Sequence, residues 1–411
     1  MNFKDKRVLI IGAGISGKGA YNALIHLGAC PIIFDDSCDV VDCKILDNVD
    51  IVVISPSVKL THLLVQTAKR KGMYICGEIE LGFAIHTMGH NSQSPTIAIT
   101  GTNGKTTLCR MLNQLLQLSG RTVCLAGNIG VSFSSAASLM DYDVSILEVS
   151  SFQLQSIDFF APKISIITNI SPDHLDIHDN MQEYVNAKFA ITKNQTKDDY
   201  LLLGDIDQKY LQGLKTKAKV IHLGVSTQET ELMPQLHLSG EFNHRVLYQV
   251  AKIFKISDDL VRQTIDSYVS DSHRLEFVAR VGNTDYINDS KATNIGATLY
   301  ALSQVKGSIA LLLGGSDKGL DYNELFVKIP TNVHYIFAFG NITNTLHKVA
   351  LQNNKEVTLC DSMQDAILQA SKTTVDTVLL SPASASFDSF KDYKDRGDTF
   401  KSIVNQLLSK Y

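Results

Sequence analysis

The sequence predicts an α/β protein of three domains, each built on a mainly parallel sheet. In three successive stretches, short runs rich in β-branched residues alternate with helical patterns, which is typical of parallel sheets with crossover helices. The 411 residues are enough for two or three domains of ordinary size, and 44% of them are hydrophobic, which allows a substantial core. We place the domains at residues 1–93, 94–271 and 272–411.

Each domain has its own predicted strands, which are short apolar runs. They are 7–11, 31–34, 50–54 and 73–76 in the first domain, 96–100, 144–149 and 164–170 in the second, and 284–288, 308–315, 333–340 and 376–382 in the third. The first domain ends in the polar stretch 86–94, which we interpret as a linker.

The composition argues against several kinds of partner. A net charge of −4 gives no reason to expect nucleic acid or an anionic membrane. The seven cysteines have no CxxC spacing, which favours a reduced compartment over a disulfide framework. The apolar run from Val8 to Ile11 is too short for a signal peptide or a membrane span. We therefore expect a cytoplasmic protein without membrane insertion.

The strongest motif follows the predicted strand 96–100 and precedes an amphipathic helical pattern. It reads Gly101, Thr102, Asn103, Gly104, Lys105, Thr106 and Thr107. Glycines let the backbone wrap a phosphate, the helix N-terminus supplies N–H groups, and Lys105 supplies a cation. Thr106 stands where a P-loop hydroxyl binds magnesium, although this loop is shorter than the usual form. The pattern predicts a nucleotide-phosphate site, and its alternative is a glycine turn with a surface lysine.

Three residues further along fit the same site. Glu148 lies at the carboxyl end of the predicted strand 144–149 and can hold magnesium as a Walker-B acid does. His174 follows the next predicted strand, at the edge where α/β sheets bind ligands. Lys188 lies on a predicted helix and, taken alone, is interpreted as a solvated lysine.

The first domain carries a GxGxxG pattern at Gly12, Gly14 and Gly17, and Asp35 and Asp36 follow its second predicted strand. An NAD-dependent oxidoreductase is therefore one alternative. The same turn binds any diphosphate, however, and the domain has roughly half the strands of a full dinucleotide-binding fold. We favour a diphosphate-bearing ligand other than NAD.

Polar turns follow three predicted strands of the third domain, at 289–294, 314–318 and 381–390. All three lie at strand carboxyl ends, which form the ligand edge of such a sheet. Their Lys, Thr and Ser residues predict a site for a small anion, such as the carboxylate of an amino acid. Arg274 precedes them and can reach a phosphate that is being transferred.

Together these motifs resemble the Mur ligase family, over essentially the whole chain. GTNGKTT is similar to the loop of the whole superfamily, which includes folylpolyglutamate synthases. The segments that narrow the resemblance are GNIG at 127–130, EVSSFQL at 148–154, SPDHLD at 171–176, HRLE at 273–276 and NDSKATN at 288–294. SPASASFDSF at 381–390, with Arg396 and Gly397 downstream, is similar to the members that add D-glutamate.

The resemblance implies an ATP-dependent ligase of peptidoglycan precursor synthesis, which adds D-glutamate to UDP-N-acetylmuramoyl-L-alanine through an acyl phosphate. It implies a Rossmann-like first domain for UDP, a central P-loop domain for ATP and a Rossmann-like third domain for the amino acid. It also implies two Mg²⁺ ions, carbamylation of Lys188 by CO₂ and a monomer.

The resemblance also assigns residues to each ligand. For ATP it implies Gly101, Thr102, Asn103, Gly104, Lys105, Thr106, Thr107, Asn243, Arg274, Asp289 and Lys291. For the sugar nucleotide it implies Ile15, Ser16, Asp36, Asn128, Ser150, Gln153 and His174. For D-glutamate it implies Thr293, Lys318, Ser386, Phe387 and Tyr393. For metal it implies Thr106, Glu148, His174 and Lys188 as a carbamate, and for catalysis Lys105, His174, Lys188 and Arg274.

The chain departs from the family pattern at Ser37, Ser57 and Val246, where an arginine, a glycine and a second asparagine are common. These departures change the expected uridine contacts and leave the catalytic set intact. Three alternatives stay open: another amide ligase of the superfamily, an NAD-binding oxidoreductase, and a nucleotide-binding protein without catalysis. The full catalytic set favours an enzyme, because a binding module has no use for all of it.

Overall fold

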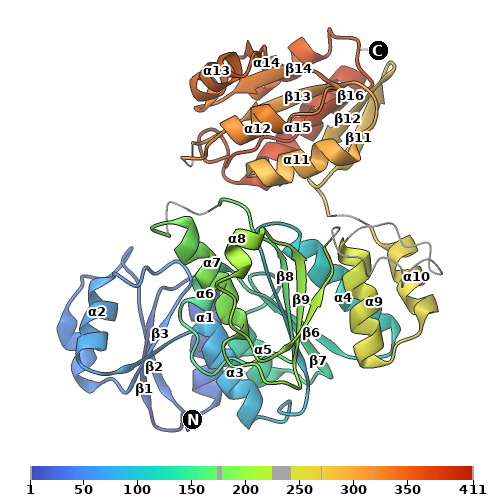
Figure 1. Ribbon diagram of the computed structural model, residues 1–411. Helices are drawn as coiled ribbons and strands as arrows, with labels where there is room; N and C mark the ends of the chain where they lie inside the picture. The colour runs from blue at the N-terminus through green and yellow to red at the C-terminus, as the bar shows by residue number, and fades with distance from the viewer. Residues whose placement is uncertain (1, 174–177, 225–241, 270, 318, 410–411) are drawn as a thin grey trace. The chain divides into compact units, whose positions relative to one another are not determined.

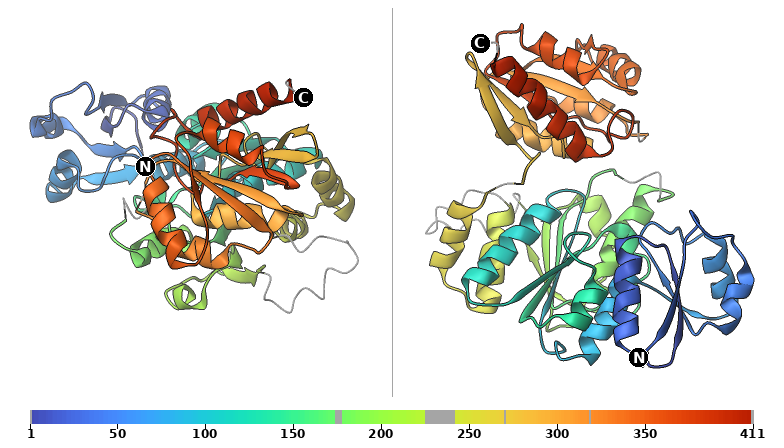
Figure 2. Two further views of the ribbon diagram at one scale, coloured as in Figure 1. Left: turned by 90° about the horizontal axis from the view of Figure 1, so that it is seen from above. Right: turned by 180° about the vertical axis from the view of Figure 1, so that it is seen from behind.

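The computed structural model describes residues 2–173, 178–224, 242–269, 271–317 and 319–409. They form three sheets with helices on their faces (Figure 1, Figure 2), and every strand pair is parallel except β11 (Glu276–Val281) with β12 (Thr284–Asn288). The predicted α/β fold is therefore confirmed. Two compact units are present, Met1–Ile170 with Asn180–Tyr268 and Ser171–Asp179 with Val269–Tyr411. The domain boundaries at 93/94 and 271/272 stay predictions.

The first sheet has the strand order β2-β1-β3-β4. Its strands are β1 (Arg7–Ile11), β2 (Cys30–Phe34), β3 (Ile51–Ile54) and β4 (Tyr74–Gly77), and its helices are α1 (Ile15–His26), the 3₁₀ helix η1 (Cys43–Asn48), α2 (Leu63–Arg70) and α3 (Glu78–Met88). β1 and β3 are continuous apolar runs because helices cover both faces of a parallel sheet.

The second sheet has the order β10-β9-β8-β5-β7-β6. Its strands are β5 (Thr96–Thr100), β6 (Val123–Gly127), β7 (Val144–Glu148), β8 (Ile164–Asn169), β9 (Tyr200–Asp205) and β10 (Lys219–His222). Its helices are α4 (Lys105–Leu118), α5 (Phe133–Leu139), α6 (Ser151–Leu154), α7 (Met181–Phe189), η2 (Ala190–Thr192), α8 (Gln208–Leu211), α9 (Phe242–Phe254) and α10 (Asp258–Ser267). β5 lies between β7 and β8, so the loop after β5 is flanked by the carboxyl ends of both neighbours.

The third sheet has the order β11-β12-β16-β13-β14-β15. Its remaining strands are β13 (Ile309–Gly314), β14 (Val333–Phe339), β15 (Thr358–Leu359) and β16 (Thr377–Leu380). Its helices are α11 (Ile295–Gln304), α12 (Asn323–Lys328), α13 (Thr343–Gln352), α14 (Met363–Ala370) and α15 (Tyr393–Leu408). The strongly apolar β13 is central and fully buried, with β16 and β14 on its two sides.

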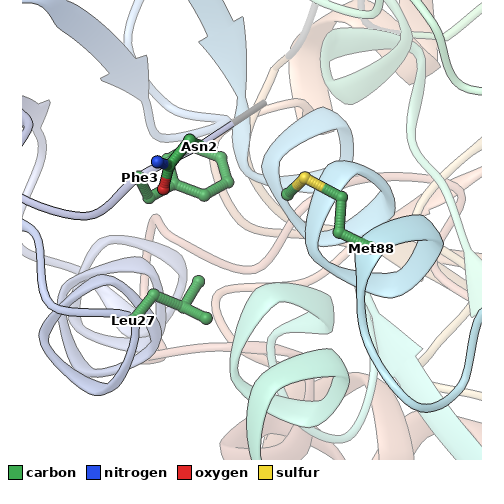
Figure 3. Close-up of a pocket in the computed structure, with 4 residues that line it drawn as sticks. All are labelled: Asn2, Phe3, Leu27 and Met88. Atoms are coloured by element: carbon green, nitrogen blue, oxygen red, sulfur yellow. The ribbon is translucent and has the colours of Figure 1, made fainter.

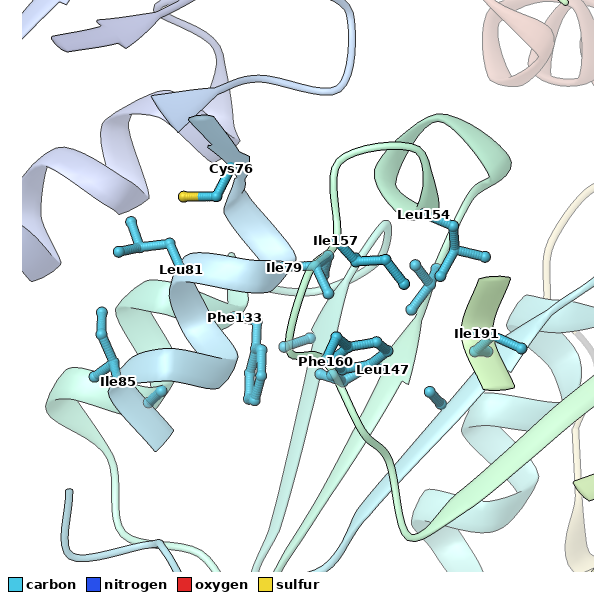
Figure 4. Packing of buried hydrophobic residues seen from close by; sticks show 14 of the residues in the cluster. Cys76, Ile79, Leu81, Ile85, Phe133, Leu147, Leu154, Ile157, Phe160 and Ile191 are labelled. Carbon is cyan, nitrogen blue, oxygen red and sulfur yellow. The ribbon is translucent and has the colours of Figure 1, made fainter. Parts of the chain in front are cut away.

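One hydrophobic cluster joins the first two sheets. Figure 4 shows Cys76 and Ile79, from the end of β4 and the start of α3, in the same cluster as Phe133, Leu147 and Phe160 of the second sheet's part. The exposed fractions of these five side chains are 2% or less. Burial of this much apolar surface is the dominant favourable term in folding, so the first sheet shares its core with the second.

Two buried carboxylates of α3 reinforce this joint. Glu78 Oε1 accepts hydrogen bonds from the backbone N–H and the hydroxyl of Ser134, both at 2.7 Å. Glu80 accepts three backbone N–H groups, those of Asp158, Phe159 and Phe160, at 2.7–3.0 Å. Burial raises the pKa of Glu78. The carboxylates therefore tie the first turn of α3 to the helix α5 and to the loop at 158–160.

The polar stretch 86–94 contains two buried polar residues, His86 and Asn91, and its interpretation as a linker stays a prediction. His86 belongs to α3, and its Nδ1 lies 3.0 Å from the hydroxyl of buried Tyr142. Asn91 donates to Met140 O at 2.7 Å and accepts from Tyr142 N at 3.2 Å. These hydrogen bonds tie the stretch to residues 140 and 142, which precede β7.

Candidate active site

The loop after β5 turns tightly at two glycines before α4 begins at Lys105. Gly101 has φ +140°, and a Cβ built on it would lie 2.0 Å from Thr168 Oγ1. Gly104 has φ +83°, in the left-handed region that favours glycine, and a Cβ on it would meet no atom within 4 Å. The loop is therefore closed against β8 on one side and open over the helix N-terminus, where a phosphate binds best.

Residues at the end of β8 hold this loop in place. Thr102 N donates to Asn169 O, and Asn103 N donates to Asn169 Oδ1, both at 2.9 Å. Asn103 O accepts from Thr168 Oγ1 at 2.6 Å and from Asn169 Nδ2 at 3.1 Å. The sequence prediction did not include Thr168 or Asn169, because they hold the loop by hydrogen bonds and do not belong to a recognisable motif.

Lys105, the predicted phosphate cation, is folded back over its own loop. Its Nζ donates to Gly101 O and Thr102 O, both at 2.7 Å. Main-chain carbonyls are weaker partners for an ammonium than a phosphate, because a hydrogen bond between two charged groups is roughly twice as strong. Lys105 is thus positioned to exchange these carbonyls for a ligand's phosphate.

Lys188 lies beside the same loop, and its interpretation as a solvated lysine is wrong. Only 2% of the residue is exposed, and its Nζ donates to Gly101 O at 2.8 Å. The ammonium also lies 4.4 Å from the centre of the Tyr184 ring, whose hydroxyl is 3.1 Å from Thr102 Oγ1. A lysine is almost never fully buried without a partner or a task, so this position favours a functional role.

Thr106, Glu148 and Asn128 form an oxygen-rich cluster at the start of α4. Thr106 Oγ1 donates to Glu148 Oε2 at 2.8 Å, and Asn128 Nδ2 donates to Glu148 Oε1 at 2.9 Å. Glu148 is 2% exposed. A buried carboxylate and a hydroxyl next to a phosphate loop are the hard oxygen ligands that Mg²⁺ prefers, so these residues fit that ion.

No group of three His, Cys, Asp or Glu side chains in the part of the chain that the structure describes can hold a metal ion by itself. His174, the predicted metal and substrate residue, lies outside the described residues. A metal at Thr106 and Glu148 therefore needs further oxygens, which phosphates supply.

Ser150 and Gln153 bind each other in a capping box at the start of α6. Ser150 N donates to Gln153 Oε1 at 2.9 Å, and Gln153 N donates to Ser150 Oγ at 3.4 Å. This gives both side chains a structural task. Their contact with a sugar nucleotide stays a prediction.

In the first sheet, the two aspartates after β2 have different partners. Asp35 accepts from Ala13 N in the glycine-rich turn at 2.6 Å, and hydrogen bonds from Ser37 and Ala13 lower its pKa to about 2. Oδ1 of Asp36, the predicted ligand residue, lies 3.1 Å from His62 Nε2, and the Asp36 side chain stays largely exposed. Ile15 is 78% exposed and Ser16 is half-buried at the start of α1, so both are open to a ligand at this turn.

In the second unit, Asp289 is buried between the predicted turns. Its carboxylate accepts from Ser381 Oγ at 2.8 Å and from Leu275 N at 3.3 Å. Burial raises its pKa to about 7, while Ser381 and the charge of Arg274 act in the opposite direction. His273 and Leu275, on either side of Arg274, have φ of 65° and 45°, a conformation that non-glycine residues adopt at a cost. Arg274 therefore lies between two strained residues, and its Nε is buried without a hydrogen-bond partner in the described part of the chain.

The predicted amino-acid residues lie at the carboxyl edge of the third sheet. Thr293 is half-buried and Ser386 is 2% exposed, whereas Phe387 is 74% exposed. Tyr393 begins α15, and Lys291 Nζ lies 5.9 Å from the centre of its ring and 3.3 Å from Asp271. Lys318 lies outside the described residues.

Arg396 organises this edge, a role that sequence reasoning missed. It is fully buried, and its guanidinium donates five hydrogen bonds at 2.9–3.2 Å. The acceptors are the hydroxyl and carbonyl of Ser290 and the carbonyls of Gly314, Ser384 and Ala385. One side chain therefore connects all three predicted polar turns. The only signal in the sequence was the Arg396–Gly397 pair, which matched the family pattern but to which no role was assigned.

A surface pocket lies away from these residues. Asn2, Phe3, Leu27 and Met88 line it, near the C-terminal ends of α1 and α3 (Figure 3). None of the four is a predicted site residue, and none ionises, so it offers no chemistry for the predicted reaction. No helix among the described residues is long and apolar enough to cross a bilayer.

Two family models match the chain, the Mur ligase middle domain at residues 99–260 and the Mur ligase, glutamate ligase domain at residues 273–384. Two relatives named UDP-N-acetylmuramoylalanine--D-glutamate ligase are each 34% identical to it. The one from Caldanaerobacter subterraneus subsp. tengcongensis aligns over 99% of this chain and 100% of its own length. The one from Natranaerobius thermophilus aligns over 98% of this chain and 99% of its own length.

Solved structures show the same fold. The MurF ligase of Thermotoga maritima in complex with ADP has a TM-score of 0.61 at 14% identity, over 99% of this chain and 96% of that one. The UDP-N-acetylmuramate-alanine ligase MurC of the same organism has a TM-score of 0.57 at 13% identity, over 99% of this chain and 100% of that one.

Because its relatives exceed 30% identity over their full length, the chain belongs to the Mur ligase family. Within that family, its full-length similarity is to proteins named for the addition of D-glutamate. The resemblance found in the sequence is thereby confirmed.

Proposed function

We propose that this chain is the ATP-dependent ligase that joins D-glutamate to UDP-N-acetylmuramoyl-L-alanine, a step in peptidoglycan precursor synthesis. The observation that carries the proposal is the cluster at the start of α4. There Lys105, Lys188, Thr106 and Glu148 surround one phosphate loop, within hydrogen-bond distance of it or of one another. The similarity to full-length relatives named for this reaction supports the same substrates.

The proposed reaction has two steps. First, a carboxylate oxygen of the alanyl group attacks the γ-phosphorus of ATP, the bond to the β-phosphate oxygen breaks, and ADP leaves. The amine of D-glutamate then attacks the carbon of the acyl phosphate, inorganic phosphate leaves, and the nitrogen loses a proton. Phosphoryl transfer needs positioning and charge stabilisation more than covalent help from the protein.

The side chains divide this work. Lys105 leaves the carbonyls of its loop to bind ATP's phosphates, and Arg274 stabilises the charge on the transferring group. Thr106 and Glu148 would hold one Mg²⁺, and His174 and Lys188 a second; these ions would supply positive charge to the phosphates. The Lys188 ammonium repels a cation, but after it loses a proton its amine can add CO₂ with release of a second proton, and the carbamate that forms is an anionic oxygen ligand.

The remaining predicted residues bind the two other substrates. Ile15, Ser16 and Asp36 contact the uridine diphosphate, and Asn128 contacts the muramoyl-alanine end. Thr293, Lys318, Ser386, Phe387 and Tyr393 bind D-glutamate. The acyl phosphate hydrolyses in water, so the amino-acid part must exclude solvent during the reaction. The proposal includes a cytoplasmic, monomeric enzyme.

The test is phosphate release from ATP with UDP-N-acetylmuramoyl-L-alanine, in parallel reactions that contain D-glutamate, L-glutamate, L-alanine, L-lysine or no amino acid. Release that depends on D-glutamate alone is the expected result. Dependence on a different amino acid would keep the ligase and reject D-glutamate. If no amino acid supports release under conditions in which a known ligase works, the proposal is rejected, and NAD titration then tests the oxidoreductase alternative.

A further inference from the structure

The helix α9 runs beside the phosphate-loop helix α4. Residues of both helices belong to one hydrophobic cluster on the same face of the second sheet, among them Leu112 and Leu247, and Figure 1 shows the two helices as neighbours. α9 begins at Phe242, and a Cβ on Gly204 would lie 3.1 Å from that phenyl ring. Gly204 belongs to β9, one strand beyond the β8 residues that hold the phosphate loop. The first turn of α9 thus lies at the same sheet edge as the loop.

Arg245, in this first turn, has an unusual environment. It is 4% exposed, and its Nε and Nη2 have no hydrogen-bond partner within the described part of the chain. Burial lowers its pKa, and the negative charge of Asp205 counteracts this effect only in part. More than nine in ten buried polar groups in proteins have a partner, so two orphaned donors on one guanidinium require an explanation.

The two orphaned atoms form one edge of the guanidinium. Nε–H and an Nη2–H point to the same side of its plane, and this pair binds two neighbouring acceptor atoms at once. The nearby Asp205 is paired in register with Asn169, and Asn169 binds Asn103 of the phosphate loop. The unsatisfied edge therefore belongs to a residue beside the end of β9, and β9 is two strands from β5, which carries the loop, at about 4.8 Å per strand spacing.

We infer that Arg245 binds the nucleoside end of the nucleotide whose phosphates lie on the loop, and that it sets the affinity for that nucleotide. This inference rests on the proposed use of ATP. The loop already supplies donors for the phosphates, so Arg245 is not needed for them. Val246, which follows Arg245 in α9, is fully buried and apolar, so it offers the nucleoside no hydrogen bond. A nucleoside has two kinds of acceptor that suit the edge, N7 of the purine and the ribose hydroxyls.

The experiment compares Arg245→Met, which removes the donors and keeps a long apolar stem, with wild type. Lys252→Ala is the matched control, because Lys252 is an exposed cation of the same helix that contacts only the Tyr248 ring among the described contacts. The KM for ATP and the Kd for ADP should rise at least about tenfold in Arg245→Met, as expected for hydrogen bonds to a charged group. The KM values for D-glutamate and the sugar nucleotide should stay within twofold.

A purely structural arginine predicts a different pattern. Replacing a buried, unpaired charge by an apolar group should leave the melting temperature without nucleotide equal or higher, and only the stabilisation by ADP should fall. A lower melting temperature with unchanged ADP affinity would overturn the inference. Measuring ADP binding directly separates the two proposals, since a chain that binds ADP through Arg245 but ligates nothing rejects only the proposed reaction. Wild type that binds no ADP rejects both.

Nucleotide analogues identify the contact. 7-Deaza-ATP lacks N7, and 2′-deoxy-ATP lacks one ribose hydroxyl. The analogue that lacks the acceptor should bind wild type less tightly than ATP does, and that difference should disappear in Arg245→Met, as in a double-mutant cycle. 3′-Deoxy-ATP tests the other ribose hydroxyl in the same way. If none of the three analogues distinguishes the two proteins, the inference fails.

Discussion

The ligand edges of the second and third sheets both carry cations, but they hold them in opposite ways. Lys105 and Lys188 donate to carbonyls of the phosphate loop itself, which are partners that a charged ligand can replace. Arg396 of the third sheet is fully buried and donates five hydrogen bonds to three separate turns.

The difference lies in what each charge is for. A lysine ammonium on a flexible stem can change partners, whereas the planar guanidinium fixes several acceptors at once. In the proposed reaction, the second sheet therefore presents its charges to the substrates, while the arginine beside the third sheet shapes the loops that are predicted to bind D-glutamate. Loss of either lysine should therefore lower the ligase activity, and loss of the arginine should lower the free energy of unfolding.

The largest effect is expected from Lys188→Ala. It should lower kcat/KM by at least about 10²-fold, because in the proposed reaction Lys188 holds a metal ion beside the transferring phosphate, and added bicarbonate should not restore activity. Phosphate release with D-glutamate measures this. Lys193→Ala, an exposed lysine paired with Asp158, is the control and should change little. Near-normal turnover of Lys188→Ala would remove its proposed role at the metal.

Arg396→Met should act on stability. It leaves the buried carbonyls of Ser290 and Ser384 without a donor among the described residues, whereas Gly314 O and Ala385 O each keep another one, so the second unit should lose about 3–5 kcal/mol of unfolding free energy. Urea unfolding of the full chain measures this loss. The control is Arg280→Ala, because Arg280 is exposed and its pair with Asp285 lies at the surface, where such pairs contribute little. Equal stability of both variants would show that Arg396 does not organise the edge.

Asp289→Asn should change how stability depends on pH. The buried carboxyl has a folded pKa of about 7 against an ordinary value of 3.8, so its contribution is fully present below pH 4 and is lost as pH rises through 7. Between pH 5 and pH 8 wild type should lose roughly 2–3 kcal/mol that the variant keeps. Urea midpoints across this range measure the difference. Asp285→Asn should keep the wild-type slope, because a hydrogen bond from Arg280 lowers the pKa of Asp285 and it stays ionised throughout.

The parts predicted well from the sequence are those whose signal is local. The Val- and Ile-rich strands β1, β3 and β5 and the loop GTNGKTT are each contained in a few consecutive residues, and the structure places them as expected. The strands β6, β9 and β10 were not predicted. β10 is mostly exposed and carries little apolar signal, so its pairing with β9 decides its structure.

Long-range contacts could not be predicted in the same way. Lys188 is buried because α7 brings it to Gly101, 87 positions earlier in the chain, and the local helical pattern contains no trace of that contact. Arg396 binds Ser290, 106 positions away, for the same reason. Acidic residues in the first turn of α3 indicate only a helix start, yet Glu80 reaches a loop about 80 positions further on.

A substitution of Glu80 tests whether its carboxylate stabilises the contact between the first two sheets, as the Arg396 guanidinium is expected to stabilise the turns of the third sheet. In Glu80→Gln one acceptor oxygen becomes an amide that donates, and it then faces backbone N–H groups that it cannot satisfy. The first unit should lose about 1–2 kcal/mol, measured by urea unfolding. The control is Glu324→Gln, whose carboxylate pairs only with exposed Lys328 among the described contacts. If Glu80→Gln matched this control, the shared hydrophobic cluster alone would hold the two sheets together, and the carboxylate would direct α3 without stabilising it.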